Sequence, residues 1–228
     1  MPLPRRISRK ALRPVARIYY RFFFGRDGGL ARGLARLTRA WEGASDRGDT
    51  PLPASRWDQQ YQAGRWDFLA DPQEAARYGT IAGLLQALGK PASVLDVGCG
   101  EGLLRRFLPQ ELSYLGIDVS AAAIERARGQ AGPGDRFEVA DAETWVPPGT
   151  FQAVVLNESL YYFLDPLAQA RRYLSLVAPE GVLVVSMFES PRTAAILRRL
   201  EADLPLLDGV RLTGRRGSWR VVAFQRRG

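Results

Sequence analysis

Residues 93–102 read Ser-Val-Leu-Asp-Val-Gly-Cys-Gly-Glu-Gly, and this stretch decides the fold. Its first half, Ser93–Val97, is apolar and β-branched, as expected of a buried parallel strand. Three alternating glycines beginning at Gly98 end the strand, and a helical pattern follows over 103–108. Glycine permits positive φ and lets a ligand approach the backbone, and a helix N-terminus offers free N–H groups. The stretch therefore predicts a strand, a ligand-binding turn and a helix.

The spacing of the glycines indicates which ligand the turn takes. The dinucleotide fingerprint Gly-x-Gly-x-x-Gly needs a glycine at the position that Leu103 occupies. The acidic residue Asp96 comes before the first glycine, where it would repel a pyrophosphate but could pair with an ammonium group. This arrangement disfavours a dinucleotide and favours a zwitterionic ligand.

Residues 94–102 resemble motif I of the class I S-adenosylmethionine (SAM) dependent methyltransferases, and the resemblance extends from about Trp57 to the C-terminus. It implies SAM as the cofactor and an α/β fold. The expected architecture is a Rossmann-like, seven-stranded, mostly parallel sheet with an antiparallel C-terminal hairpin and an N-terminal helical extension. The cofactor residues implied at the turn are Asp96, Gly98, Cys99 and Gly100, with Cys99 as a small buried residue. The alternative is a glycine turn of a Rossmann-like fold that binds another ligand.

Composition excludes several kinds of chemistry. The 228 residues include no histidine and one cysteine, Cys99. A His base, a Ser-His-Asp triad, an intrachain disulfide and a cysteine-based zinc cluster are thereby excluded. The magnesium-dependent, catechol-type methyltransferases use a carboxylate cluster that we cannot assemble from this sequence, so we expect no metal.

Charge divides the chain into unequal parts. The net charge is +8, and residues 1–50 hold 12 Arg or Lys against 4 Asp or Glu, so all of the excess belongs to them. We expect residues 1–50 to form a basic helical arm, 51–90 a lid and first helix, and 91–228 the SAM-binding core. Within the arm, residues 1–42 could contact an anionic membrane surface; packing on the domain or a homodimer contact is the alternative. The remaining residues carry no net charge, and a neutral core argues against a nucleic-acid groove in the catalytic body, so we expect no DNA partner.

The segment from Trp57 to Leu69 resembles the lid of nodulation-type N-methyltransferases and small-molecule relatives. By that resemblance, Tyr61 and Trp66 cover the cofactor and Arg65 meets its carboxylate. The alternative is that these aromatic residues dock the arm on the domain. An amphipathic helix is expected over 73–89.

Two further acidic positions match the family. The strand expected over 113–118 ends at Asp118, and an acid there, with Val119 beside it, would bind the two ribose hydroxyls; capping of the helix expected over 121–130 is the alternative. After a strand over 136–140, Asp141 with the Ala142 amide would meet the adenine. A plain loop acid is the alternative for Asp141.

The strand expected over 151–156 runs into Asn157-Glu158-Ser159-Leu160-Tyr161-Tyr162, at the position of motif IV. We expect Asn157 to contact the cofactor, and Glu158, Tyr161 and Tyr162 to be the catalytic candidates. Without histidine, an oxygen acceptor needs such a base; Glu158 acting only to orient the cofactor or acceptor is the alternative. The Asn-Pro-Pro-Tyr signature of DNA amino-methylating enzymes is absent, which disfavours a DNA base as the acceptor.

The remaining elements are typical of the family. A helix is expected from Asp165 to about Val177, then a turn into a strand over 182–188, a helix containing Leu197 and two strands over 206–213 and 218–226. Gly214-Arg215-Arg216-Gly217 is a hairpin signal between the last two strands.

These features predict a cytoplasmic SAM-dependent O- or N-methyltransferase of a small molecule or saccharide, with membrane association through the basic arm left open. A non-catalytic SAM- or nucleoside-binding module tethered to a membrane or partner is one alternative. A tRNA or protein methyltransferase that docks through the basic arm is another. No motif identifies the acceptor.

Overall fold

The computed structural model describes residues 52–226. Its centre is a seven-stranded sheet in the order β3-β2-β1-β4-β5-β7-β6. Within the sheet only β7 runs against its neighbours, pairing antiparallel with β5 and β6. The predicted mostly parallel sheet with an antiparallel C-terminal hairpin is confirmed. The strands are β1 (Ser93–Val97), β2 (Ser113–Asp118), β3 (Asp135–Val139), β4 (Phe151–Asn157), β5 (Val177–Phe188), β6 (Leu206–Gly214) and β7 (Gly217–Gln225).

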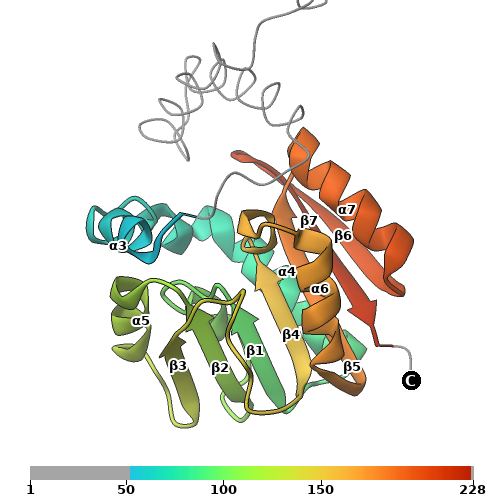
Figure 1. The fold of residues 1–228 in the computed structure, drawn as a ribbon, viewed down its shortest axis with the longest axis horizontal. Coiled ribbons are helices and arrows are strands. Elements are labelled where there is room, and N and C mark those ends of the chain that lie inside the picture. The colour runs from blue at the N-terminus through green and yellow to red at the C-terminus, as the bar shows by residue number, and fades with distance from the viewer. Residues whose placement is uncertain (1–51, 227–228) are drawn as a thin grey trace, which may run out of the picture.

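Helices cover both faces of this sheet (Figure 1). One face packs against α6 (Pro166–Ser175) and α7 (Pro191–Asp203), whose apolar residues form one buried cluster with the strands. The opposite face packs against α4 (Pro72–Leu88) and α5 (Ala121–Arg128) in a second cluster. Because both faces are covered, the central strands are mostly apolar.

The strand order places a switch point at the centre of the sheet. From β1 the chain proceeds to β2 and β3 on one side, and from β4 to β5 on the other. Crossovers that leave in opposite directions open a crevice at the carboxyl ends of β1 and β4, where open α/β sheets bind ligands. Two segments lie at this end: α3 (Ala54–Gln62), followed by the short helix η2 (Asp67–Ala70), and the short helix η4 (Leu160–Tyr162).

The segment after the glycine turn differs from the prediction. Instead of an α-helix over 103–108, residues Leu103–Phe107 form a 3₁₀ helix, η3. The cause is Pro109, since a residue that precedes proline is pushed out of the helical region. Leu108 is accordingly extended, with φ −101° and ψ 151°. The turn is therefore not followed by a long helix with a large dipole.

β5 also begins earlier than expected. It starts at Val177, and its pairing with β4 shifts register between Phe151 and Ala153. The expected turn is a bulge inside the strand, with Glu180 at φ 63°. A Cβ at Gly181 would lie 2.4 Å from the carbonyl oxygen of Gln152, so the bulge requires glycine there. α6 ends at Ser175, two residues before the expected end.

The expectations for residues 1–50 and their membrane or dimer contacts lie outside the described residues. Between residues 52 and 226, no helix is long and apolar enough to cross a bilayer.

Candidate active site

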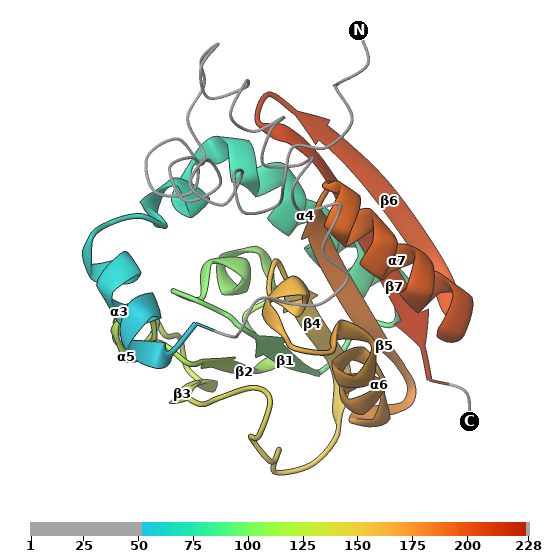
Figure 2. The ribbon, with the colours of Figure 1, turned by 45° about the horizontal axis from the view of Figure 1, so that its top comes forward.

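A cavity of about 600 Å³ opens at the carboxyl ends of β1, β2 and β4. Residues of α3 and η2 line it opposite the sheet, and Figure 2 shows α3 beside α5 at this end. The cavity also receives residues from α4, the loop after β3, the end of β5 and the β6–β7 hairpin. It coincides with the switch-point crevice that the topology produces.

The glycine turn forms the floor of the cavity on one side. Gly98, Gly100 and Gly102 all have positive φ, between 55° and 73°. A Cβ at Gly98 would lie 2.6 Å from the Cβ of Ser159, and one at Gly100 would lie 2.7 Å from the Tyr61 hydroxyl oxygen. The first two glycines are thus required by conformation and by space.

Cys99 lines the same turn. Burial raises the pKa of the Cys99 thiol well above its usual value. A thiol with a raised pKa stays protonated and is a poor nucleophile. Cys99 is half-buried and lines the cavity, and its packing role stays a prediction.

Asp96 lies beneath the turn, is 1% exposed and is not itself among the residues that line the cavity. The Tyr114 hydroxyl donates a hydrogen bond to Oδ2, whereas Oδ1 is buried and has no hydrogen-bond partner among residues 52–226. Burial raises the pKa of Asp96 to about 7, with the charge of Asp118 adding to the effect. A buried carboxylate oxygen without a partner is costly, and it suits a cationic ligand group.

Asp118 and Val119 line the cavity next to the turn. Asp118 accepts hydrogen bonds from the backbone N–H groups of Gly100 and Ser120, both at 2.9 Å. Ser120 caps α5 by accepting from the Ala123 N–H. Asp118 therefore braces the glycine turn, and its burial raises its pKa; contact with a ribose stays a prediction.

Asp141 and Ala142 also line the cavity, from the loop after β3. Asp141 is exposed, and its Oδ1 accepts from the Glu143 N–H at 2.9 Å. The Tyr173 hydroxyl holds the Ala142 carbonyl at 2.8 Å. The loop is thus fixed at the cavity edge, where contact with an adenine stays a prediction.

The lid residues divide into two groups. Tyr61 is 7% exposed and lines the cavity with Trp66, their ring centroids 6.3 Å apart. Trp57 also lines it and stacks on Trp66 at 5.8 Å. Arg65, in contrast, is exposed and is not among the lining residues. The structure therefore does not bring Arg65 to the cavity as the sequence suggested, because the turn at residues 63–66 directs it to solvent.

Asp58, which the sequence analysis did not select, anchors the lid. Its Oδ1 accepts from the Ser120 hydroxyl at 2.7 Å and from the Ala122 N–H at 3.1 Å. The hydrogen bond from Ser120 lowers the pKa of Asp58. On the same side, Arg126 donates to the Tyr61 carbonyl at 3.0 Å. These contacts hold α3 against both ends of α5.

The motif IV residues form the opposite wall of the cavity. Glu158 has φ 59°, an uncommon conformation for a residue other than glycine and a frequent one at functional sites. Its carboxylate accepts from the Tyr161 hydroxyl at 3.1 Å and from the Ser186 hydroxyl at 3.5 Å. Burial raises the pKa of Glu158 to about 7, and the charge of Arg77 opposes part of that shift.

The aromatic catalytic candidates differ in exposure. Burial raises the pKa of Tyr161 well above its usual value, so its hydroxyl stays a hydrogen-bond donor. Tyr162 is 38% exposed and meets the edge of the Trp57 ring at 4.9 Å. Tyr161 therefore orients Glu158, while Tyr162 joins the motif IV wall to the lid.

Two buried charges at the site were missed from the sequence. Arg77 and Glu74 on α4 are each 2% exposed and pair at 3.0 Å. Arg77 also donates to the side-chain oxygen of Asn157. The sequence did contain a signal for the burial of Arg77, because this residue falls on the same helical face as Ile81 and Leu85.

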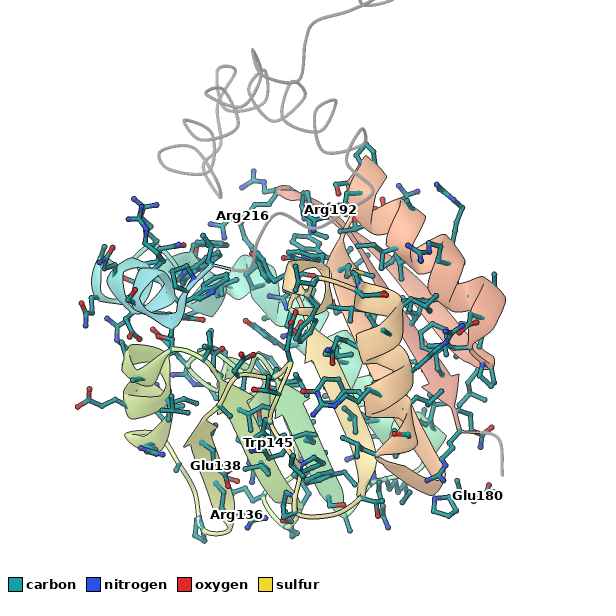
Figure 3. All side chains as sticks on the ribbon, viewed as in Figure 1. Arg136, Glu138, Trp145, Glu180, Arg192 and Arg216 are labelled. Atoms are coloured by element: carbon teal, nitrogen blue, oxygen red, sulfur yellow. The ribbon has the colours of Figure 1, made fainter. Side chains whose placement is uncertain are left out.

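A further missed residue, Arg216, comes from the β6–β7 turn, at the cavity end of the sheet and opposite to Glu180 (Figure 3). It pairs with Asp71 at 2.5 Å and with Glu74 at 3.6 Å. No group of three potential metal-ligating residues occurs between residues 52 and 226.

Comparison with known proteins agrees with this geometry. The family described as "Methyltransferase domain" matches residues 53–223. The trans-aconitate 2-methyltransferase of Methylobacterium radiotolerans is 35% identical over 125 residues, covering 52% of this chain and 47% of the relative. An uncharacterized methyltransferase of Mycobacterium tuberculosis is 38% identical over 101 residues, covering 43% and 51%. The chain thus spans about half the length of the curated relatives it matches.

Solved structures share the fold. The N-methyltransferase NodS from Bradyrhizobium japonicum, in complex with S-adenosylhomocysteine, has a TM-score of 0.64 at 21% identity, covering 72% of this chain and 92% of that one. A 1,6-didemethyltoxoflavin N1-methyltransferase from Burkholderia thailandensis has a TM-score of 0.58 at 23% identity, covering 80% and 94%.

Proposed function

The chain belongs to the methyltransferase domain family, specifically to its class I SAM-dependent fold, and from that premise we propose that it transfers a methyl group from SAM to a hydroxyl or amine of a small molecule. The observation that carries this proposal is the buried Asp96 Oδ1, which lacks a partner beneath a glycine turn that opens on a cavity. That arrangement fits the ammonium group of SAM, whose binding would offset the cost of the buried carboxylate.

The same cavity supplies positions for the rest of the cofactor. The turn of Gly98, Cys99 and Gly100 would hold its amino-acid part, with Asn157 at the end of β4. Asp118 and Val119 would hold the ribose, and the loop after β3 the adenine, under a lid of Tyr61 and Trp66. The residues proposed for that loop are Asp141 and Ala142.

SAM, when bound, supplies a methyl group on a positively charged sulfur, so the carbon is already activated. The protein has mainly to align the acceptor and exclude water. Glu158 has its pKa near 7, the range suited to a general base at neutral pH. It takes the proton of a hydroxyl acceptor, while the Tyr161 hydroxyl holds the carboxylate in place and Tyr162 closes the wall toward the lid.

The experiment that tests turnover is the release of S-adenosylhomocysteine from SAM in the presence of a panel of hydroxyl, amine and carboxylate acceptors. At least one acceptor should raise the release several-fold above the rate without acceptor, and Glu158→Gln should reduce that increase for hydroxyl acceptors. SAM binding without release for any acceptor would instead favour a non-catalytic binding module.

A further inference from the structure

The half of the cavity away from the glycine turn is where an acceptor would bind, and its walls are mostly aromatic. They include Phe68 from η2, Tyr161 from the segment after β4, Phe188 from the end of β5 and Trp219 from β7. Phe188 and Trp219 meet edge to face with their centroids 5.4 Å apart. We refer to this region as the acceptor half.

Charges in the acceptor half are balanced. Its carboxylates are Glu74 and Glu158, and its cations are Arg77 and Arg216. Arg77 pairs with Glu74 at 3.0 Å, and Arg216 pairs with Asp71 at 2.5 Å and Glu74 at 3.6 Å. Each arginine is therefore already neutralised by acids of this chain. An anionic acceptor would gain little from them and would be repelled by ionised Glu158.

The polar side chains of the acceptor half also bond one another. Arg77 donates to Asn157, and Tyr161 donates to Glu158. A saccharide gives up water at many hydroxyl groups when it is buried, and each lost hydrogen bond must be replaced. Arg216 Nε is buried and has no hydrogen-bond partner between residues 52 and 226, but the other polar groups named here are paired with one another. Glu158 is therefore the main group left to receive a proton, and the rings provide the remaining contact surface.

We propose that the acceptor is a neutral, flat aromatic or heteroaromatic molecule, whose acidic hydroxyl or ring N–H faces Glu158. Its ring packs between aromatic side chains of the acceptor half, which favour offset or edge-to-face contacts. This inference rests on the proposed function, because it takes the turn side of the cavity as the cofactor half. It differs from the tricarboxylate named for several relatives, which would need unpaired cations.

Binding to protein saturated with S-adenosylhomocysteine tests the inference, since the cofactor half is then filled. The first arm measures S-adenosylhomocysteine binding by calorimetry and tests the proposed function alone. The second arm titrates four probes: 2-naphthol, its saturated analogue decahydro-2-naphthol, methyl β-glucoside and trans-aconitate. The two naphthol probes have the same carbon skeleton and hydroxyl group, and differ in flatness and aromatic character.

We expect 2-naphthol to bind about tenfold more tightly than decahydro-2-naphthol, the size expected of one or two ring contacts. The glucoside and trans-aconitate should bind more weakly than either. Phe188→Leu should reduce the naphthol preference to about threefold or less, because one ring contact is lost. Phe107→Leu is the matched control, and it should keep the full preference. Phe107 is not among the lining residues, although it stacks on Tyr78, which does line the cavity.

Three outcomes would each overturn the inference. They are equal affinity for the two naphthol probes, tighter binding of trans-aconitate or the glucoside, and no binding of 2-naphthol up to millimolar concentration. These outcomes leave the proposed function intact if S-adenosylhomocysteine binds in the first arm. Failure of the first arm would overturn both.

Discussion

Replacement of Glu158 by glutamine should stabilise the protein increasingly as the pH rises. The pKa of Glu158 is raised from 4.5 to about 7 by burial, so the folded state binds this proton more tightly than the unfolded state. The stabilisation from that proton is fully present below about pH 4.5, declines as the pH rises, and is lost once the pH passes through about 7. A rise of the pKa from 4.5 to about 7 corresponds to roughly 3 kcal/mol.

Urea unfolding of the wild type and Glu158→Gln between pH 4.5 and 9 measures this difference. Glutamine does not titrate, so the free energy of unfolding of the variant minus that of the wild type should grow by roughly 3 kcal/mol from pH 4.5 to pH 9. Asp96 titrates in both proteins and cancels in the difference. The matched control is Glu180→Gln, an exposed glutamate that also has positive φ. Its difference should stay within about 0.5 kcal/mol.

The same titration should govern activity with a hydroxyl acceptor. The wild-type rate should rise with pH through about 7, as Glu158 loses its proton, and the variant should lack this rise and be slower by about 10²–10⁴-fold. Stability curves for the wild type and Glu158→Gln that run parallel across the whole pH range would refute the assigned burial of the carboxylate.

Two other substitutions test the turn and the lid. Gly98→Ala should lower the free energy of unfolding by about 1–3 kcal/mol, because Gly98 has positive φ and the new Cβ would lie 2.6 Å from the Cβ of Ser159. The control is Gly83→Ala within α4, where a Cβ would meet nothing within 4 Å, and it should raise the free energy of unfolding by up to about 1 kcal/mol in the same urea titration. Equal effects of the two substitutions would contradict the packing of the turn. Asp58→Ala should increase hydrogen exchange across α3 and speed S-adenosylhomocysteine dissociation, because α3 loses two hydrogen bonds to α5. Unchanged hydrogen exchange in α3 would show that Asp58 does not anchor the lid.

The sheet could be predicted because its signals are local. Ser93–Val97 and Ser113–Asp118 were bounded correctly, since each is a short apolar run that ends at a glycine or an acid. The hairpin at Arg215 and Arg216 followed from its flanking glycines. The helix after the glycine turn was wrong because Pro109 outweighed the apolar spacing before it.

The cavity wall was only partly predictable. Glu158 and Tyr161 lie in one motif, so their proximity followed from chain position. The pairing of Arg77 with Asn157, 80 residues apart, depends on how α4 packs on the sheet. Arg216 joins the site only because the hairpin returns beside η2. Such long-range contacts leave at most a weak signal in one sequence.

The most direct test of the central claim is calorimetric SAM binding at pH 7.5 by the wild type, Asp96→Asn and Arg65→Ala. We predict micromolar binding by the wild type, about 10–100-fold weaker binding by Asp96→Asn because a charged hydrogen-bond partner is lost, and unchanged binding by the exposed Arg65→Ala. Equal binding by the wild type and Asp96→Asn would contradict the role of Asp96. No binding by folded wild-type protein would contradict the methyltransferase account itself.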